Sequence, residues 1–329
     1  MKIIIPVAGI GSRLRPHTHT IPKILIKVAG KTIIEHILDE LLKLDHKFSE
    51  IIFIVGHFGD QVEKYITPKY KRKIRLKFVS QGERRGVGHA IYLTRKFIND
   101  EPVFIILGDT IFRANFNRII KSGKNYIGVK EVDDPRRFGI VFTDSSHKIT
   151  KFIEKPENPL SNLAIVGIYL IQNSGSLFTK LDYIIKNNIK TKGEFQITDA
   201  LQLMLKEKEV FRTFKIDKWL DCGKPETLLS TNKELLQEKH TKKRFKTAII
   251  HSPVYISKTA SIKNSVIGPY VSIGDKAVIE NSVIKNSIIN DHAQINRLLL
   301  EGSVIGSNVF VNGVYRHLNI GDSSEVALG

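Results

Sequence analysis

The sequence predicts an α/β domain with a mixed, mainly parallel sheet, followed by a parallel β-helix. Apolar runs typical of buried strands alternate with helical stretches from residue 3 to 109. From about residue 248, apolar residues recur about every six positions, with Gly, Asn, Asp and Ser between them. At 329 residues and 42% hydrophobic composition, the chain is expected to form two domains, 1–240 and 241–329.

The first apolar run, residues 3–7, ends in a loop that contains Gly9 and Gly11. This pattern predicts a buried strand that leads into a loop whose backbone approaches a ligand closely. Free backbone N–H groups, together with Arg13, Arg15 and Lys23, would suit a polyphosphate. On these residues alone, a glycine turn with solvated cations is an equally good interpretation.

The next stretch alternates helices and strands. Thr32 and Glu35 form a predicted capping box, and an apolar helical stripe runs from Ile33 to Leu42. Strands are expected at 50–55, 75–80 and 102–109, and helices at 59–66 and about 88–97. The AGIGSR and LGD segments each follow a predicted parallel strand, so they should lie at the same edge of the sheet. Ligands of such sheets bind at the carboxyl ends of the strands.

The middle of the chain is more mixed. Strand candidates lie within 127–132, 138–142, 149–156 and 164–171, and helices are expected at 176–187 and from Thr198 onward. A closing helix is expected at 225–240, and the basic run 239–246 reads as a linker.

The apolar repeat of the tail restarts at residues 250, 267, 284 and 300. A strand period of two would place apolar residues far more often, so this spacing favours stacked triangular coils. Such coils have flat faces and open ends that pack against other copies or against the catalytic domain, and a homo-oligomer is expected.

Composition excludes several classes of protein. The net charge is +18, but the lysines are scattered among acids. The denser basic runs at 67–77 and 239–246 lack regularly spaced aromatic residues, so no nucleic-acid partner is expected, and the charge would instead attract anionic substrates. Cys222 is the one cysteine, two residues precede the first strand, and no apolar run approaches the ~20 residues that span a bilayer. A cytoplasmic protein with no membrane partner is expected.

Motifs that occur in order along the chain resemble those of the sugar nucleotidyltransferase family. AGIGSRLRPHTHTIPK is similar to the signature loop GGxGTRLxPxTxxxPK, and LGDTIF resembles the strand-end aspartate motif of glucose-1-phosphate thymidylyltransferases. IEKPENPLSNLAIVGIYLI is similar to their sugar-binding segment, and GEFQITDA and WLDCGKPETLLSTN are similar to their closing motifs. The tail resembles the hexapeptide repeats of long-form members. The resemblance implies a Rossmann-like nucleotidyltransferase domain followed by a left-handed β-helix.

The resemblance also implies the reaction. A nucleoside triphosphate, with dTTP preferred, would react with a hexose 1-phosphate, with glucose 1-phosphate preferred, and pyrophosphate would leave. The sugar phosphate is already an anionic nucleophile, so the reaction needs charge neutralisation and in-line positioning rather than a general base. By the same resemblance, Asp109 and Asp221 would bind Mg²⁺, Arg13 would stabilise the triphosphate and the pyrophosphate, and Lys23 would bridge the reacting phosphates. For Asp109 alone, a turn cap is the alternative.

Further site residues follow from matched motif positions. The nucleotide is expected to contact Ala8, Gly9, Gly11, Ser12, Arg13, Gln81, Gly86 and Asp109. The amide of Gln81 offers a donor and an acceptor for the edge of a pyrimidine. The sugar phosphate is expected to contact Gly139, Glu154, Lys155, Gly167, Tyr169 and Lys192. Glu154 would bind sugar hydroxyls and Lys155 the phosphate, although these two residues alone could be a surface ion pair.

The chain departs from the family pattern at several positions. Ile10 replaces the second glycine of the signature loop, which restricts that position, and Ser12 replaces threonine. Arg84 stands where proline is common, and Lys192 stands where an arginine would supply a bidentate fork. The segment GVGHA is also similar to uridylyltransferases, and one methyl group in a pocket is worth only about 1–3 kcal/mol. UTP is therefore an alternative to dTTP.

Two other functions remain as alternatives. Hexapeptide β-helices often belong to acyltransferases, and His292 or His317 could serve as the catalytic histidine of a bifunctional enzyme. Neither histidine lies in a recognised motif, so acyl transfer is not expected. The chain could also be a non-catalytic regulatory subunit, but it retains Arg13, Lys23, Asp109 and Asp221 together, which argues against this.

Overall fold

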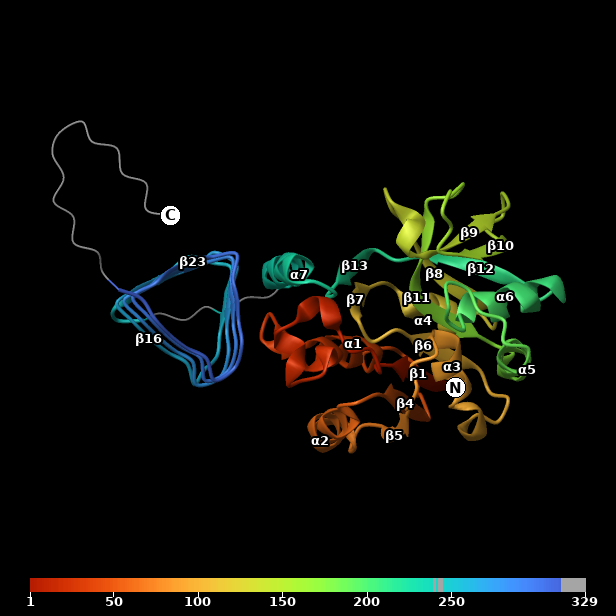
Figure 1. The fold of residues 1–329 in the computed structure, drawn as a ribbon, viewed down its shortest axis with the longest axis horizontal. Coiled ribbons are helices and arrows are strands. Elements are labelled where there is room, and N and C mark those ends of the chain that lie inside the picture. The colour runs from red at the N-terminus through yellow and green to blue at the C-terminus, as the bar shows by residue number, and fades with distance from the viewer. Residues whose placement is uncertain (239–240, 242–244, 315–329) are drawn as a thin grey trace. The chain divides into compact units, whose positions relative to one another are not determined.

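The structure is a computed structural model that describes residues 1–238, 241 and 245–314. It divides into two compact units, one made of residues 1–26 and 31–227 and the other of residues 27–30 and the chain from 228 onward (Figure 1). The predicted domain boundary at residue 240 stays a prediction. Most of the predicted linker at 239–246 lies outside the described residues.

The first unit contains a sheet of nine strands. These strands are β1 (Lys2–Pro6), β4 (Glu50–Val55), β5 (Arg75–Ser80), β6 (Val103–Ile106), β8 (Asn125–Glu131), β9 (Gly139–Thr143), β10 (Ile149–Glu154), β11 (Leu163–Ile171) and β12 (Phe211–Lys215). Their order is β10-β9-β11-β6-β1-β4-β5, and β8 pairs with β11 and β12. The sheet is mixed, because β11 runs antiparallel to both β6 and β8 whereas β6, β1, β4 and β5 are parallel.

The shorter strands outside this sheet are β2 (Lys27–Val28), β3 (Lys31–Thr32), β7 (Thr110–Arg113) and β13 (Lys218–Asp221). Strand β13 pairs antiparallel with β7, so residue 221 lies opposite residue 110. This pairing brings the WLD segment, which lies far along the chain, next to the LGD segment.

The α-helices are α1 (Ile33–Leu41), α2 (Gly59–Tyr70), α3 (Val87–Tyr92), α4 (Phe116–Ile120), α5 (Ser174–Lys186), α6 (Ile197–Lys206) and α7 (Pro225–Glu238). The 3-10 helices are η1 (Ser12–Leu14), η2 (His17–His19), η3 (Lys23–Leu25), η4 (Arg95–Phe97) and η5 (Pro135–Arg137). The predicted capping box of α1 is present. The helix predicted to begin at about residue 88 is present as α3, but its predicted end at residue 97 is wrong: α3 ends at Tyr92, and the buried Thr94 hydroxyl donates to the carbonyl of Ile91 before η4 begins.

Helices pack on both faces of the sheet. On one face, Ile4, Val103 and Ile105 join a buried apolar cluster with residues of α3, α5 and α6, among them Ile91 and Leu201. On the other face, the ring of Phe104 lies 5.4 Å from that of Phe116 on α4. Because successive side chains of β6 point to opposite faces, a fully apolar strand is needed to fill both layers.

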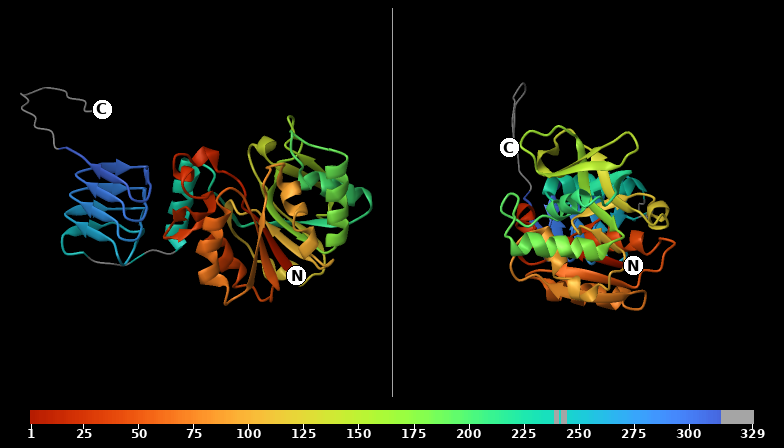
Figure 2. Two further views of the ribbon diagram at one scale, coloured as in Figure 1. Left: turned by 60° about the horizontal axis from the view of Figure 1, so that its bottom comes forward. Right: turned by 90° about the vertical axis from the view of Figure 1, so that its right-hand side faces the viewer.

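The second unit contains a left-handed parallel β-helix that is triangular in cross-section (Figure 1), with its coils stacked in register (Figure 2). Its three four-stranded sheets are β14 (Ala248–Ile250), β17 (Ser265–Ile267), β20 (Val283–Lys285) and β23 (Leu299–Glu301); β15 (Val254–Ile256), β18 (Val271–Ile273), β21 (Ile288–Ile289) and β24 (Val304–Ile305); and β16 (Ser261–Lys263), β19 (Val278–Glu280), β22 (Gln294–Asn296) and β25 (Phe310–Asn312). The predicted repeat is confirmed, because Ile267, Ile273 and Ile279 fill the interior with no exposed surface.

Within the described residues, no helix is long and apolar enough to cross a membrane.

Candidate active site

The carboxyl ends of β1 and β6 carry the loops of the candidate site. The amide of Val7 donates to the Ile54 carbonyl at 2.8 Å, and the amide of Gly108 donates to the Pro6 carbonyl at 3.1 Å. These bonds extend the parallel ladder past the ends of the strands. They hold the start of the glycine loop beside Asp109, at the edge of the sheet where ligands of such folds gather.

The glycine loop needs a left-handed backbone at Gly11, where φ is +68°. A Cβ atom at this position would lie 3.1 Å from both Lys23 Cβ and Thr18 Cγ2, so a side chain would be both strained and crowded. Gly9 has no neighbour within 4 Å of such an atom, which leaves its backbone open. Ile10 has no positive φ and is exposed, so the loop accommodates this departure from the family pattern without backbone strain.

Lys23 forms an ion pair with Asp109 in which Nζ lies 3.3 Å from Oδ2. The Lys23 side chain is 9% exposed, whereas that of Asp109 is 54% exposed. Packing under the glycine loop therefore fixes the lysine stem and presents the ammonium group, while one face of the carboxylate stays open to a ligand.

Asp221 lies at the end of β13, opposite Thr110 of β7 and therefore close to Asp109. Its Oδ1 accepts the amide of Gly223 at 2.8 Å, and the Thr110 hydroxyl donates to Asp109 Oδ1 at 3.1 Å. Among the described residues, no group of three or more His, Cys, Asp or Glu residues could hold a metal ion. Two carboxylates with hard oxygens fit Mg²⁺, which takes its remaining ligands from water and phosphate.

Arg13 lies beside the same turn. A Cβ atom on Gly223 would lie 3.1 Å from Arg13 Nη2 and 2.8 Å from Asp221 Oδ1. Glycine at this position therefore allows the guanidinium group to approach the Asp221 turn. The site brings two cations and two carboxylates together, a set that suits phosphate groups and a bridging metal ion.

A cavity of about 360 Å³ lies beside Arg13, Lys23 and Asp109, whereas Asp221 is not among the residues that line it. The structure places every predicted nucleotide-binding residue on its wall: Ala8, Gly9, Gly11, Ser12, Arg13, Gln81, Gly86 and Asp109. Lys23 and Gly223 also line it. Arg84 and Glu194 are lining residues that the sequence did not single out as ligands, although Glu194 belongs to the GEFQITDA motif.

Gln81 and Gly86 form one end of the cavity. Gln81 is buried, and its Nε2 donates to the Gly86 carbonyl at 3.2 Å. Gly86 has a φ of +106°, and a Cβ atom there would lie 2.5 Å from the carbonyl oxygen of Phe195. The amide of Gly88 donates to that same oxygen at 2.8 Å, so the turn before α3 is fixed against the segment before α6.

Glu154 is the centre of the predicted sugar-phosphate site. It lies at the end of β10, opposite Gly139 of β9. A Cβ atom at Gly139 would lie 2.8 Å from Glu154 Oε2, so only glycine leaves room for this carboxylate. The same oxygen accepts the hydroxyl of Thr198 at 2.7 Å. Burial raises the pKa of Glu154, while the Thr198 hydroxyl and the Lys155 ammonium oppose that shift.

Tyr169 links the two halves of the site. It is buried on β11 opposite Ile105 of β6, and burial raises its pKa, with a further rise from the charges of Glu154 and Asp109. Its ring therefore lies within electrostatic reach of both carboxylates. Gly167 on the same strand has a φ of +79°, and a Cβ atom there would clash with Leu107.

Two lysines near the sugar site form ion pairs. Lys155 Nζ lies 3.5 Å from Glu154 Oε1, and Lys192 Nζ lies 2.7 Å from Glu157 Oε1. Glu157 and Thr198 were missed from the sequence; Thr198 lies in the GEFQITDA motif, but nothing in its residue type signals a contact with Glu154. Lys192 lies near the 155–157 segment and does not line the 360 Å³ cavity.

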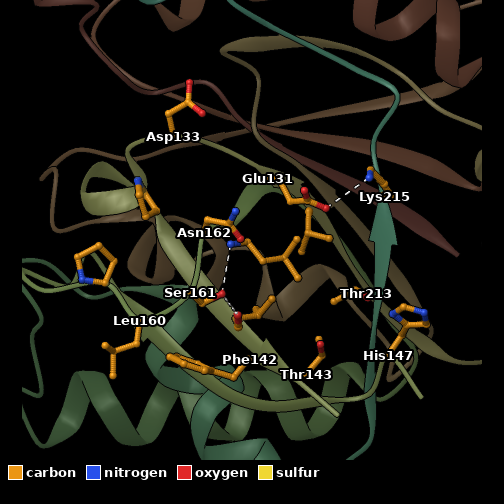
Figure 3. A pocket seen from close by; sticks show the side chains of 15 residues that line it. Glu131, Asp133, Phe142, Thr143, His147, Leu160, Ser161, Asn162, Thr213 and Lys215 are labelled. Carbon is orange, nitrogen blue, oxygen red and sulfur yellow. Dashed lines mark hydrogen bonds and ion pairs between the residues drawn. The ribbon is translucent and has the colours of Figure 1, made fainter. Parts of the chain in front are cut away.

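A wider hollow of about 870 Å³ lies elsewhere on this unit (Figure 3). The ion pair between Glu131 and Lys215, 3.4 Å long, lies along its wall, and the Ser161 hydroxyl donates to the Val141 carbonyl at 2.7 Å. None of the residues predicted to bind nucleotide or sugar lines this hollow. All the predicted nucleotide-binding residues line the smaller cavity instead.

Two family models match the chain. The nucleotidyl transferase model matches residues 2–238, and the model described as GlmU-like, C-terminal hexapeptide, matches residues 233–316. The chain belongs to the nucleotidyl transferase family. Its activity is that of a sugar-phosphate nucleotidyltransferase, and members of this family typically use a divalent metal ion.

Similar curated proteins carry different names. The low-salt glycan biosynthesis nucleotidyltransferase Agl11 of Haloferax volcanii is 30% identical over 364 residues, which cover 100% of both chains. The bifunctional protein GlmU of Methanocaldococcus jannaschii is 34% identical over 94% of this chain and 78% of that protein. A glucose-1-phosphate thymidylyltransferase of Streptomyces antibioticus is 26% identical over 100% of this chain and 99% of that protein.

Solved structures show the same catalytic fold. A UDP-glucose pyrophosphorylase complexed with UDP-glucose superimposes with a TM-score of 0.62 at 25% sequence identity. The match covers 72% of this chain and 99% of that one.

Proposed function

We propose that the chain forms a pyrimidine nucleoside diphosphate hexose, with dTTP and glucose 1-phosphate as the preferred substrates and UTP as the alternative nucleotide. The observation that carries this proposal is the single cavity with Lys23, Asp109 and Arg13 at its phosphate end and Gln81 and Gly86 at its other end. The names of the relatives divide between thymidine and uridine chemistry. The proposal therefore depends on the edge that thymine and uracil share.

The reaction needs no general base, because the attacking oxygen of the sugar phosphate is already ionised. This oxygen forms a bond to the α-phosphorus, the bond from that phosphorus to the β-phosphate bridge breaks, and pyrophosphate leaves. Lys23 would hold the two reacting phosphates near each other, and Arg13 would stabilise the departing pyrophosphate. Asp109 and Asp221 would hold Mg²⁺, which neutralises phosphate charge when it is bound.

At the sugar end, Glu154 would accept hydrogen bonds from hexose hydroxyls and Lys155 would contact the phosphate. The carboxylate of Glu154 can accept further hydrogen bonds, which supports this role. Thr198 bonds only Oε2, and Lys155 lies 3.5 Å from Oε1. Gly139, Gly167, Tyr169 and Lys192 would complete the surroundings of the hexose. The place of Tyr169 on β11 supports a sugar phosphate that extends from one carboxylate to the other, because β11 pairs with β6, which precedes Asp109, and with β9, which pairs with Glu154 of β10.

The test is a substrate panel with the purified full chain and Mg²⁺. Pyrophosphate release is measured with dTTP, UTP, CTP, ATP and GTP against the 1-phosphates of glucose, mannose, galactose and N-acetylglucosamine. We expect dTTP or UTP with glucose 1-phosphate to give the highest kcat/KM, and chelation of Mg²⁺ to abolish turnover. Absence of pyrophosphate release with every pair would contradict the proposal.

The GlmU-like match over residues 233–316 makes acyl transfer the second candidate activity. His292 is exposed on the β-helix, and its amide donates to the Asp275 carbonyl at 2.8 Å. His317 lies outside the described residues. Release of free coenzyme A from acetyl-CoA in the presence of glucosamine 1-phosphate would reveal this activity, and we expect none.

We also propose that the chain forms a homo-oligomer through its β-helix. One outer face carries an apolar column formed by Ile249, Val266, Val283 and Leu299, which stack in register across four coils. Ile249, Val283 and Leu299 are 60%, 43% and 82% exposed. A continuous exposed apolar surface of this kind favours contact with a second copy.

A further inference from the structure

The amide group of Gln81 has only one orientation that fits its surroundings. The carbonyl oxygen of Gly86 can only accept a hydrogen bond, so the side-chain atom of Gln81 that lies 3.2 Å from it must be Nε2. The same Nε2 lies 3.4 Å from Nδ1 of His89 on α3. Both amide hydrogens of Gln81 therefore point toward protein acceptors.

The surroundings of His89 favour the neutral ring, although the charge of Glu83 opposes this effect. Burial lowers the pKa of His89, and the positive charge of Arg85 lowers it further. In the neutral ring with its proton on Nε2, Nδ1 is an acceptor and can receive the second amide hydrogen of Gln81. His89 itself is not among the residues that line the nucleotide cavity, whereas Gln81 is.

The Gly86 carbonyl is a rigid acceptor. It also receives the amide of Ala90 at 3.1 Å, within the first turn of α3. The backbone around it is held by two bonds to Phe195, whose oxygen accepts from Gly88 at 2.8 Å and whose amide donates to Arg85 at 2.8 Å. The first hydrogen bond of the Gln81 amide is therefore anchored by backbone, and the second depends on one side chain.

We propose that His89 is a positioning residue that fixes the Gln81 amide so that only its Oε1 atom faces the nucleotide, which selects bases with a ring N–H over cytosine. This inference rests on the proposed function. Among the described residues, no protein donor bonds Gln81 Oε1. Uracil and thymine offer an N3–H donor to this oxygen. Cytosine carries a lone pair at N3, which would place two acceptors face to face.

The experiment compares UTP with CTP, which have the same ribose and nearly the same size. In His89→Leu the acceptor is lost but an apolar side chain of similar length remains. We expect the KM for UTP to rise about tenfold, the kcat/KM preference for UTP over CTP to fall about tenfold, and kcat to stay unchanged. The KM for the hexose 1-phosphate should also stay unchanged.

His89→Asn is the matched control. Its Oδ1 can occupy nearly the position of Nδ1 and accept from Gln81, so it should restore the wild-type KM for UTP and the preference over CTP. Thermal melting of both variants checks that α3 remains folded. A preference for UTP that is unchanged in His89→Leu would overturn the inference, and so would a preference lost equally in both variants.

The failure of this inference is distinguishable from failure of the proposed function. If the wild-type chain uses neither UTP nor dTTP, the proposed function fails. If it uses either and the His89 variants do not change base preference, only the role of His89 fails.

Discussion

At the scale of single residues, the candidate site combines a buried lysine with a solvent-exposed carboxylate. The Lys23 side chain is buried beneath the glycine loop, while the Asp109 carboxylate that it contacts is half exposed. A charge that is held by packing before the substrate arrives needs little reorganisation when negative charge develops on the phosphates. We therefore expect the position of Lys23 to affect turnover more than its ion pair affects stability.

Lys23→Met should remove the ammonium group and keep the buried stem. We expect kcat to fall by about 10² to 10³-fold, which is the usual effect of losing one preorganised electrostatic contact. Stability should change little, because the Asp109 carboxylate stays hydrated. Pyrophosphate release measures the effect, and Lys31→Met, which removes an exposed lysine paired with Asp39, is the control. Equal turnover in the two variants would contradict the role of Lys23.

Glu154→Gln tests the cost of a buried carboxylate. Burial raises its pKa above the unfolded value, so the folded protein binds the proton more tightly. The free energy of unfolding then falls as the pH rises from the unfolded pKa of Glu154 through its folded pKa, and this loss persists at neutral pH. The variant should therefore have a higher Tm than wild type at about pH 7, and the difference should vanish at about pH 4. Its turnover should nevertheless fall.

Glu157→Gln is the control for this measurement, because it should not raise the Tm at neutral pH. Lys192 lowers the pKa of Glu157, so the ionised form is favoured in the folded protein. Because the Glu157 side chain is 82% exposed, solvent screens the pair and the Tm should fall slightly or stay the same at neutral pH. A rise in Tm in both glutamine variants would mean that burial of Glu154 is not the cause.

The resemblance to the motifs of the family indicated the predicted nucleotide-binding residues that line the smaller cavity, and the pattern of apolar strand followed by glycine loop indicated Gly9 and Gly11 independently. The sequence could not indicate the contact of Thr198 with Glu154, since these residues come from α6 and β10 and meet only after the sheet has formed. The role of His89 was also hidden. Its effect passes through Gln81, and a histidine on a short helix carries no signal of its orientation.

At the scale of secondary-structure elements, the start of α1 offers a direct test. The Thr32 hydroxyl accepts the amide of Glu35 at 3.3 Å, and the Glu35 carboxylate accepts the amide of Thr32 at 2.8 Å. Thr32→Ala should lower the free energy of unfolding by about 1 kcal/mol. Urea denaturation measures this change, and Thr32→Ser, which keeps the hydroxyl, should remain close to wild type. Equal loss in both variants would assign the effect to side-chain packing.

The bounds of β4 and β5 were predicted to the residue: β4 is an almost unbroken apolar run, and β5 alternates polar with apolar residues. The direction of β11 was not predicted. An apolar run has the same pattern in a parallel or an antiparallel strand, and its insertion between β6 and β8 depends on contacts far apart in sequence. The break after α3 was also missed, since Thr94 continues the helical pattern but turns its hydroxyl back onto the chain.

At the scale of the whole molecule, the apolar column of the β-helix predicts the assembly state. Leu299→Lys combined with Val283→Lys should lower the mass measured by light scattering to that of a smaller species. Gln294→Lys places the same charge on another face of the β-helix and should leave the mass unchanged. Activity should persist in both variants, because neither change touches the cavity. An unchanged mass in the double variant would contradict assembly through this face.

The in-register coils of the β-helix determine which part of it unfolds locally first. Within the β-helix, each coil forms strand pairs only with the coils directly above and below it, so an inner coil pairs with two neighbours and an outer coil with one. Interior residues reflect this difference: Ile267 and Ile284 have no exposed surface, whereas Ile250 and Leu300 are only partly buried. Amide hydrogen exchange should therefore be slowest in the middle coils and accelerate stepwise toward both ends, like a stack that frays from its outer layers.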